Sequence, residues 1–136
     1  MARDQIDMTP LQSRDDLVAW FEGGNKPKAD FRIGTEHEKF PFLRESHRAV
    51  PYEGARGIEA LLEGMQMLLG WEPIIEGGKI IGLYDVTGGG AISLEPGGQF
   101  ELSGAPLETL HQTETELMAH HAQVREIATP LGIGFL

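Results

Sequence analysis

The sequence predicts an α+β domain in which helices flank a mainly antiparallel sheet. Three stretches have the apolar spacing or the capping residues of helices, and two others each predict a pair of short strands around a glycine-containing turn. The length of 136 residues suits a single domain that buries a core of its own. Together these observations favour a mixed fold over an all-helical or all-strand one.

The N-terminal segment, residues 1–30, is predicted to be a helix followed by a linker. Ser13 can cap the helix, and Asp16 stands three residues later, where a capping box usually has glutamate. Gly23 and Gly24 end the helix, and a polar linker leads to residue 30. Residues 31–136 then hold the sheet, the other helices and the acidic motifs.

The stretch from residue 31 to residue 42 alternates with period two, which predicts a strand that Pro41 limits at its end. Glu36, Glu38 and Arg32 share one face of this strand. His37 faces the other way, so we expect it to be buried and hydrogen-bonded.

The later elements follow from the same patterns. Residues 55–70 predict an amphipathic helix that Gly70 stops, and residues 71–86 and 91–104 each predict a strand pair. Residues 106–128 predict the longest helix. Its expected buried stripe consists of Leu107, Leu110, Leu117, Val124 and Ile127, and His120 and His121 are expected on the surface.

Composition narrows the function. The formal net charge of −10 argues against nucleic acid as a partner, because binding phosphates needs a basic surface. The chain has no cysteine, which excludes a disulfide scaffold and a thiolate metal site. It also has no apolar run of membrane-spanning length and no apolar secretion signal, so we expect no membrane partner and a cytoplasmic location.

Two acidic motifs carry the chemistry. On a strand, Glu36 and Glu38 put two carboxylates on one face, where a hard cation such as Mg²⁺ can separate them. Taken alone, this pair is better explained as a solvated strand face.

The second acidic motif favours a metal site over a solvated strand face. Glu95 and Glu101 flank a turn, with Gln99 and Glu101 on the outgoing strand. Two acidic strand pairs in one small domain predict a site for two or more Mg²⁺ ions, with a polar outer hairpin face as the alternative.

Several segments resemble glutamate–cysteine ligases of the type found in plants and many proteobacteria. They include "GTEHEKF" and "SLEPGGQFELSG", in this order and at this separation, and the likeness runs from about Phe31 to the last residue. These enzymes belong to the glutamine synthetase-like carboxylate–amine ligases. The resemblance implies a curved, mainly antiparallel sheet whose concave face holds Mg²⁺, ATP and the amino-acid substrate.

The resemblance also implies roles for individual residues. Glu36, Glu38, Glu95 and Glu101 would hold the metal ions, and no catalytic residue is assigned. Gln99 and Arg32 are weaker candidates for contact with substrate or nucleotide, and Arg32 could instead pair with Glu36. The implied substrates are ATP, glutamate and cysteine, joined through an acyl phosphate in the first step of glutathione biosynthesis.

Family members are several times longer than this chain. We therefore expect residues 1–136 to be the N-terminal part of a catalytic domain, inactive alone, whose strand "GIGFL" needs a neighbour and favours self-association. Two alternatives remain open. One is a related ligase with another acceptor amine, and the other is a non-catalytic module that binds a metal or a partner.

Overall fold

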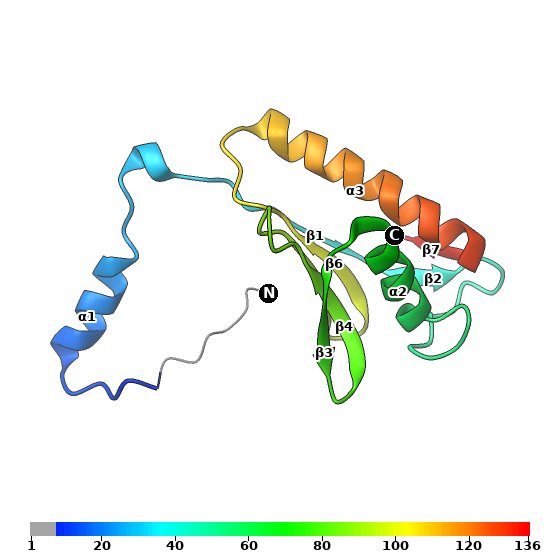
Figure 1. Cartoon of the computed structure of the whole chain (residues 1–136), viewed down its shortest axis with the longest axis horizontal. Helices are drawn as coiled ribbons and strands as arrows, with labels where there is room; N and C mark the ends of the chain where they lie inside the picture. Colours follow the sequence, from blue (N-terminus) through cyan, green and yellow to red (C-terminus); the bar gives the residue numbers. More distant parts are fainter. Residues whose placement is uncertain (1–7) are drawn as a thin grey trace.

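The structure, a computed structural model, describes residues 8–136 and confirms the α+β class (Figure 1). In this part of the chain, antiparallel strands form one sheet in the order β1-β6-β5-β4-β3, and β2 pairs with β7 in a second, smaller sheet. The strands are β1 (Glu36–Lys39), β2 (Pro41–Leu43), β3 (Glu72–Glu76), β4 (Lys79–Tyr84), β5 (Ala91–Glu95), β6 (Gln99–Ser103) and β7 (Ile133–Phe135). The α-helices are α1 (Arg14–Gly23), α2 (Ile58–Leu69) and α3 (Leu110–Leu131), and a 3₁₀ turn covers Lys28–Asp30.

Helix α1 forms where the capping residues predict it. The Ser13 side chain accepts a hydrogen bond from the backbone of Asp16, whose carboxylate accepts one from the backbone of Ser13. The helix buries no residue and stands apart from the sheets (Figure 1). Local capping, rather than packing, therefore accounts for this helix. Residues 1–7 of the predicted N-terminal segment lie outside the described residues.

Both strand pairs are hairpins, as predicted. Gly77 and Gly78 between β3 and β4 have φ angles of 55° and 81°, and Gly97 and Gly98 between β5 and β6 have 86° and 78°. Glycine adopts this left-handed region without the steric cost that other residues incur. The predicted strand over residues 31–42 is less regular. It is divided into β1 and β2, and Ile33 forms only an isolated bridge with Leu107.

The core lies on one face of the main sheet. Helices α2 and α3 pack against each other, and α2 packs against β4. The buried apolar side chains come from both helices and four strands: Ile58, Leu61, Leu62, Met65, Ile80, Leu83, Ile92, Phe100, Leu102, Val124, Ala128 and Ile133. Because the helices cover only one face, alternate residues of the strands point to the opposite face.

Two expectations for α3 are wrong. The helix begins after Thr109, which forms a capping box with Gln112, so Leu110 lies in its first turn and is 73% exposed. Val124 is buried as expected and Ile127 is partly buried, but the buried face also contains His120 and Ala128. His120 is 3% exposed and stacks on Phe100, with ring planes 17° apart, because the sheet beneath α3 sets which side of the helix is covered.

The environment of His37 also differs from the expectation. His37 is only half-buried, whereas its neighbour Lys39 is buried. The ammonium of Lys39 donates a hydrogen bond to the backbone carbonyl of His37 over 2.8 Å. The polar group that the strand buries is therefore a lysine.

The expectation that the C-terminal strand lacks a neighbour is wrong, because β7 pairs with β2 in antiparallel register. The backbones of Phe40 and Leu136 also exchange two hydrogen bonds, of 3.0 and 3.1 Å. Ile133 is buried and Phe135 packs on the ring of Phe100, although Leu136 is exposed. Self-association through this segment stays a prediction. No helix among residues 8–136 is long and apolar enough to span a membrane.

His120 gives the fold a testable pH dependence. Burial, with smaller contributions from Lys39, His121 and His37, lowers its pKa to about 3. Because the unfolded state then binds more protons, stability is lost as the pH falls below the ordinary pKa of histidine. Between about pH 7 and pH 5, His120 should cost the fold roughly 2 kcal/mol. Urea denaturation at both pH values measures the loss.

Two variants control this experiment. His120→Leu should remove most of the acid-dependent loss, whereas His111→Leu should keep it, because His111 is exposed on the same helix. An equal loss in the wild type and in His120→Leu would show that His120 is not the titrating group.

Candidate functional site

The candidate site is the face of the main sheet that the helices leave open. On β6, Phe100 and Leu102 point into the core, so Glu101 points to the other face. The register places Glu101 directly between Glu38 on β1 and Ser93 on β5. These side chains form a row across three neighbouring strands.

The other predicted glutamates lie on the same face. Glu36 is opposite Ser103, two residues along from the Glu38–Glu101 pair. Glu95 is opposite Gln99, at the end of the β5–β6 hairpin. The structure therefore brings Glu36, Glu38, Glu95 and Glu101 to one face, together with Gln99. We call this surface the acid face.

Glu95 and Glu101 influence each other's pKa. Glu101 is 2% exposed, and its Oε1 accepts a hydrogen bond of 2.6 Å from the hydroxyl of Ser103. The hydrogen bond with Glu101 raises the pKa of Glu95, and burial adds to the effect. Burial acts to raise the pKa of Glu101, but hydrogen bonds from Ser103 and Glu95 outweigh it, so its pKa is lowered. The two carboxyl groups are therefore placed to share a proton.

Lys39 lies on the opposite side of β1 from Glu36 and Glu38. It is 8% exposed, and burial lowers its pKa to about 8, although the charge of Glu101 acts against this shift. The sequence analysis assigned no role to this residue. The alternation in "EHEK" was the available signal, because it places the lysine on the core side.

The chemistry of the acid face fits Mg²⁺. Carboxylate and hydroxyl oxygens are the ligands that a hard cation takes in proteins, and water completes its coordination. Among residues 8–136, no group of three or more histidine, cysteine, aspartate or glutamate side chains is gathered closely enough to hold a metal ion. The acid face thus supplies pairs of ligands rather than a closed cage, and the metal site stays a prediction.

Arg32 does not pair with Glu36. Its guanidinium forms an ion pair of 3.1 Å with Glu108 and donates hydrogen bonds to the backbone carbonyls of Ala29 and Phe31. Arg32 is therefore held by the linker and by the segment before α3.

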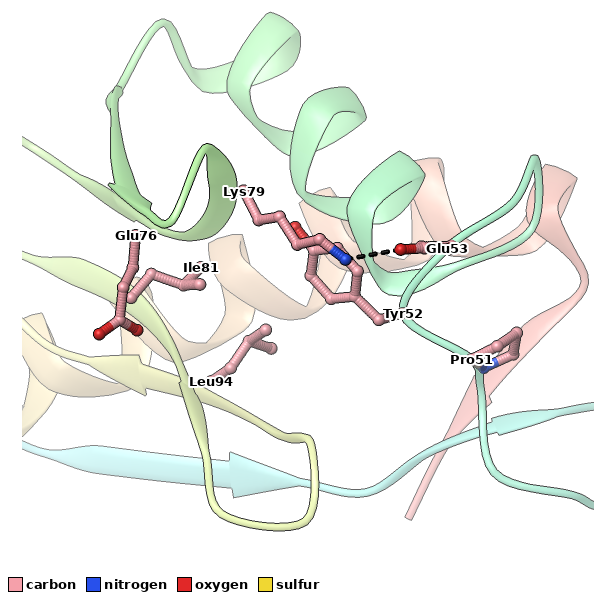
Figure 2. A pocket seen from close by; sticks show the side chains of 7 residues that line it. All are labelled: Pro51, Tyr52, Glu53, Glu76, Lys79, Ile81 and Leu94. Carbon is pink, nitrogen blue, oxygen red and sulfur yellow. Dashed lines mark hydrogen bonds and ion pairs between the residues drawn. The ribbon is translucent and has the colours of Figure 1, made fainter.

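A pocket of about 530 Å³ lies away from the acid face, between the β3–β4 hairpin and the loop before α2 (Figure 2). Lys79 crosses it over the ring of Tyr52 and forms an ion pair of 2.6 Å with Glu53. Figure 2 shows Glu76 apart from this pair, across the pocket. Because its lysine is already neutralised and no predicted site residue lines it, this pocket is a weaker candidate than the acid face.

The site is thus an antiparallel sheet with helices on one face and carboxylates from three strands on the other. Comparison with known proteins identifies the family. A family profile described as Glutamate-cysteine ligase family 2 (GCS2) matches residues 32–136. The chain therefore belongs to glutamate–cysteine ligase family 2.

Relatives that the chain resembles include glutamate–cysteine ligase A, chloroplastic, of Oryza sativa subsp. japonica, which is 48% identical over 133 residues. That alignment covers 98% of this chain and 26% of the relative. Glutamate–cysteine ligase, chloroplastic, of Arabidopsis thaliana is 52% identical over 124 residues, which are 91% of this chain and 23% of the relative. The chain thus spans about a quarter of the length of these relatives.

These names correct the expected location. Both relatives, and that of Nicotiana tabacum, are named chloroplastic, so the expectation of a cytoplasmic location is wrong. The absence of an apolar secretion signal could not have revealed this. Plastid transit segments are rich in serine and arginine rather than apolar. Neither a cytoplasmic nor a plastid protein therefore needs an apolar secretion signal.

The link between Glu95 and Glu101 can be tested by titration. Glu101→Gln removes one of the two charges, so the pKa of Glu95 should fall towards its ordinary value. Carbon-detected NMR of the glutamate carboxyl groups follows this change. A pKa raised by folding means that Glu95 favours the folded state at low pH, and that this contribution is lost as the pH rises through the raised pKa.

Glu76→Gln, on the β3–β4 hairpin, is the matched control and should leave the titration of Glu95 unchanged. If Glu95 titrates identically in the wild type and in Glu101→Gln, the two carboxyl groups are not linked.

Proposed function

We propose that this chain contributes the metal-binding face of an ATP- and Mg²⁺-dependent ligase that joins glutamate to cysteine. Membership of the family and the names of the relatives support the choice of substrates. The observation that carries the proposal is the register of β1, β6 and β5. It sets Glu38 opposite Glu101 and Glu95 opposite Gln99, so the carboxylates of three strands share one face.

The proposed reaction has two steps. The γ-carboxylate oxygen of glutamate attacks the γ-phosphorus of ATP, which forms an acyl phosphate and releases ADP. The amine nitrogen of cysteine then attacks the acyl carbon, the amine loses a proton, and inorganic phosphate leaves. Such transfers depend on positioning and charge neutralisation more than on a protein nucleophile.

The glutamates of the acid face would hold the ions. An ion held there would supply the positive charge that anionic phosphate groups need. Glu38 and Glu101 lie directly opposite each other, and like charges so placed repel, so the pair favours a cation between them. The Ser103 hydroxyl holds one oxygen of Glu101 in place with a hydrogen bond of 2.6 Å. Glu36 and Glu95 extend the same face at either end.

Gln99 and Arg32 have different prospects in this proposal. Gln99 lies on the acid face opposite Glu95, where its amide can donate to a substrate oxygen. Arg32 would reach a substrate only after leaving Glu108, with which it pairs. We therefore favour Gln99 over Arg32 as the group that contacts substrate.

Metal binding is the direct test. Mn²⁺ or Mg²⁺ should raise the melting temperature of the wild-type chain, because a ligand that binds only the folded state stabilises it by about 2.7 kcal/mol at a hundred times its Kd. Glu101→Gln and Glu36→Gln should each lose most of this rise, and Glu76→Gln should keep it. An equal response to metal in all four proteins would refute a metal site on the acid face.

The acceptor amine needs a separate test. A protein that contains this chain should release phosphate from ATP when glutamate and cysteine are both supplied, and much less when alanine replaces cysteine. Equal release with alanine would favour a related ligase with another acceptor. Metal binding without any turnover would favour a non-catalytic module. In the 136-residue chain alone we expect no turnover, because it covers about a quarter of its relatives.

A further inference from the structure

Another pocket, distinct from the one in Figure 2, lies on the helix-covered side of the main sheet, away from the acid face. It has a volume of about 380 Å³ and is formed by the second half of α3, by β7 and by the end of β1. Its base is apolar, with side chains of Val124, Ile133 and Phe135. Four basic residues also line it, Lys39, Arg44, His121 and Arg125, and the remaining lining residues are Ala128, Thr129, Gly134 and Leu136.

The charge of this pocket is opposite to that of the chain. Asp and Glu outnumber Lys and Arg by 21 to 11, yet three of those 11 basic residues line the pocket and no acidic side chain does. The basic residues are also unpaired. Within residues 8–136, the ion pairs of arginine and lysine involve Arg32, Arg56 and Lys79, and none involves the three that line this pocket. The charge of Glu101 acts on Lys39 from the other face of β1, but no acidic side chain lines the pocket itself, so its lining side chains carry a net positive charge.

Lys39 shows most clearly that the basic residues of this pocket lack partners. An ammonium group has three N–H donors, and the hydrogen bond of Lys39 is the one to the carbonyl of His37. A cation that is 8% exposed is costly unless a partner compensates for its lost hydration. The pKa of His121 is lowered by burial first, and then by the charges of Lys39, His37 and Arg125. Neighbouring cations thus disfavour one another here, and a bound anion would relieve all of them.

We propose that this pocket binds the oxyanion of a small organic molecule, with the oxyanion on the basic residues and an apolar body on Val124, Ile133 and Phe135. Arginine presents a planar set of donors that matches carboxylate and phosphate oxygens. The volume lies within the range of small-molecule sites, which combine an apolar lining with a few polar groups. The pocket is separated from the acid face by β1, so its ligand is distinct from one held there by metal.

The experiment uses probes that separate the anion from the apolar body. NMR titrations of the ¹⁵N-labelled chain, in EDTA and without nucleotide, compare phenyl phosphate, benzoate, inorganic phosphate and benzyl alcohol. We expect the two aromatic anions to shift the amides of β7 and of the second half of α3, and to bind about tenfold more tightly than inorganic phosphate. Benzyl alcohol should not bind. The better of the two aromatic anions identifies the oxyanion that the pocket accepts.

Variants test the placement. Arg125→Gln and Arg44→Gln lie at the exposed rim, so they should fold normally and weaken binding of the aromatic anions about tenfold each. Arg48→Gln removes a nearby exposed arginine outside the pocket and should bind like the wild type.

Two results would overturn the proposal. One is the absence of saturable shifts around α3 and β7. The other is an equal affinity in the wild type, Arg125→Gln and Arg44→Gln. Since no metal, ATP or amino acid is present, failure here would leave the proposed ligase function unaffected.

Discussion

The strict alternation of β6 is the constraint on which both faces of the sheet depend. Phe100 and Leu102 fill the core beneath α2 and α3, and Glu101 between them must then point to the opposite face. A shift of one residue would turn the carboxylate into the apolar core and turn both apolar side chains out of it. Burial of Phe100 and Leu102 therefore fixes the face on which Glu101 lies. The register of β6 with β1 and β5 then places Glu38 and Glu95 on the same face.

The same alternation in β1 separates charges of opposite sign. Glu36 and Glu38 lie on the side of the sheet that the helices leave uncovered, whereas Lys39 lies on the helix side and lines the pocket between α3 and β7, here called the basic pocket. The charge of Glu101 reaches Lys39 and favours its protonated form, although burial has the larger effect. A cation on the acid face would weaken this support. Occupation of the acid face and of the basic pocket should therefore be coupled electrostatically through β1.

Local signals in the sequence predicted the elements that depend on local physics. Ser13 and Asp16 marked α1, and the glycine pairs marked both hairpins, because capping and positive φ angles are properties of a few adjacent residues. The common face of the four glutamates followed from period-two alternation alone. Whether they hold a metal ion is a property of side-chain positions and ligands, which alternation does not determine.

The sequence analysis failed where tertiary contacts decide the outcome. The apolar spacing of α3 assigned Leu110 to the buried stripe and His120 to the surface. The ring of Phe100 beneath the helix instead covers His120, and the Thr109 cap sets Leu110 at the exposed N-terminal turn. β7 was expected to lack a partner because the chain was predicted to be part of a longer domain, but β7 pairs with β2.

The acid face and the core differ in what holds them in place. Phe100, Leu102 and Ile92 gain stability from burial, so their positions are secure without any ligand. Glu38 and Glu101 gain nothing from facing each other, because like charges in cross-strand pairs are destabilising. The core must therefore supply the free energy that keeps them together. Since a fold that bears this cost without a cation recovers it when one binds, the repulsion between opposed carboxylates is the physical reason to expect metal affinity on this face.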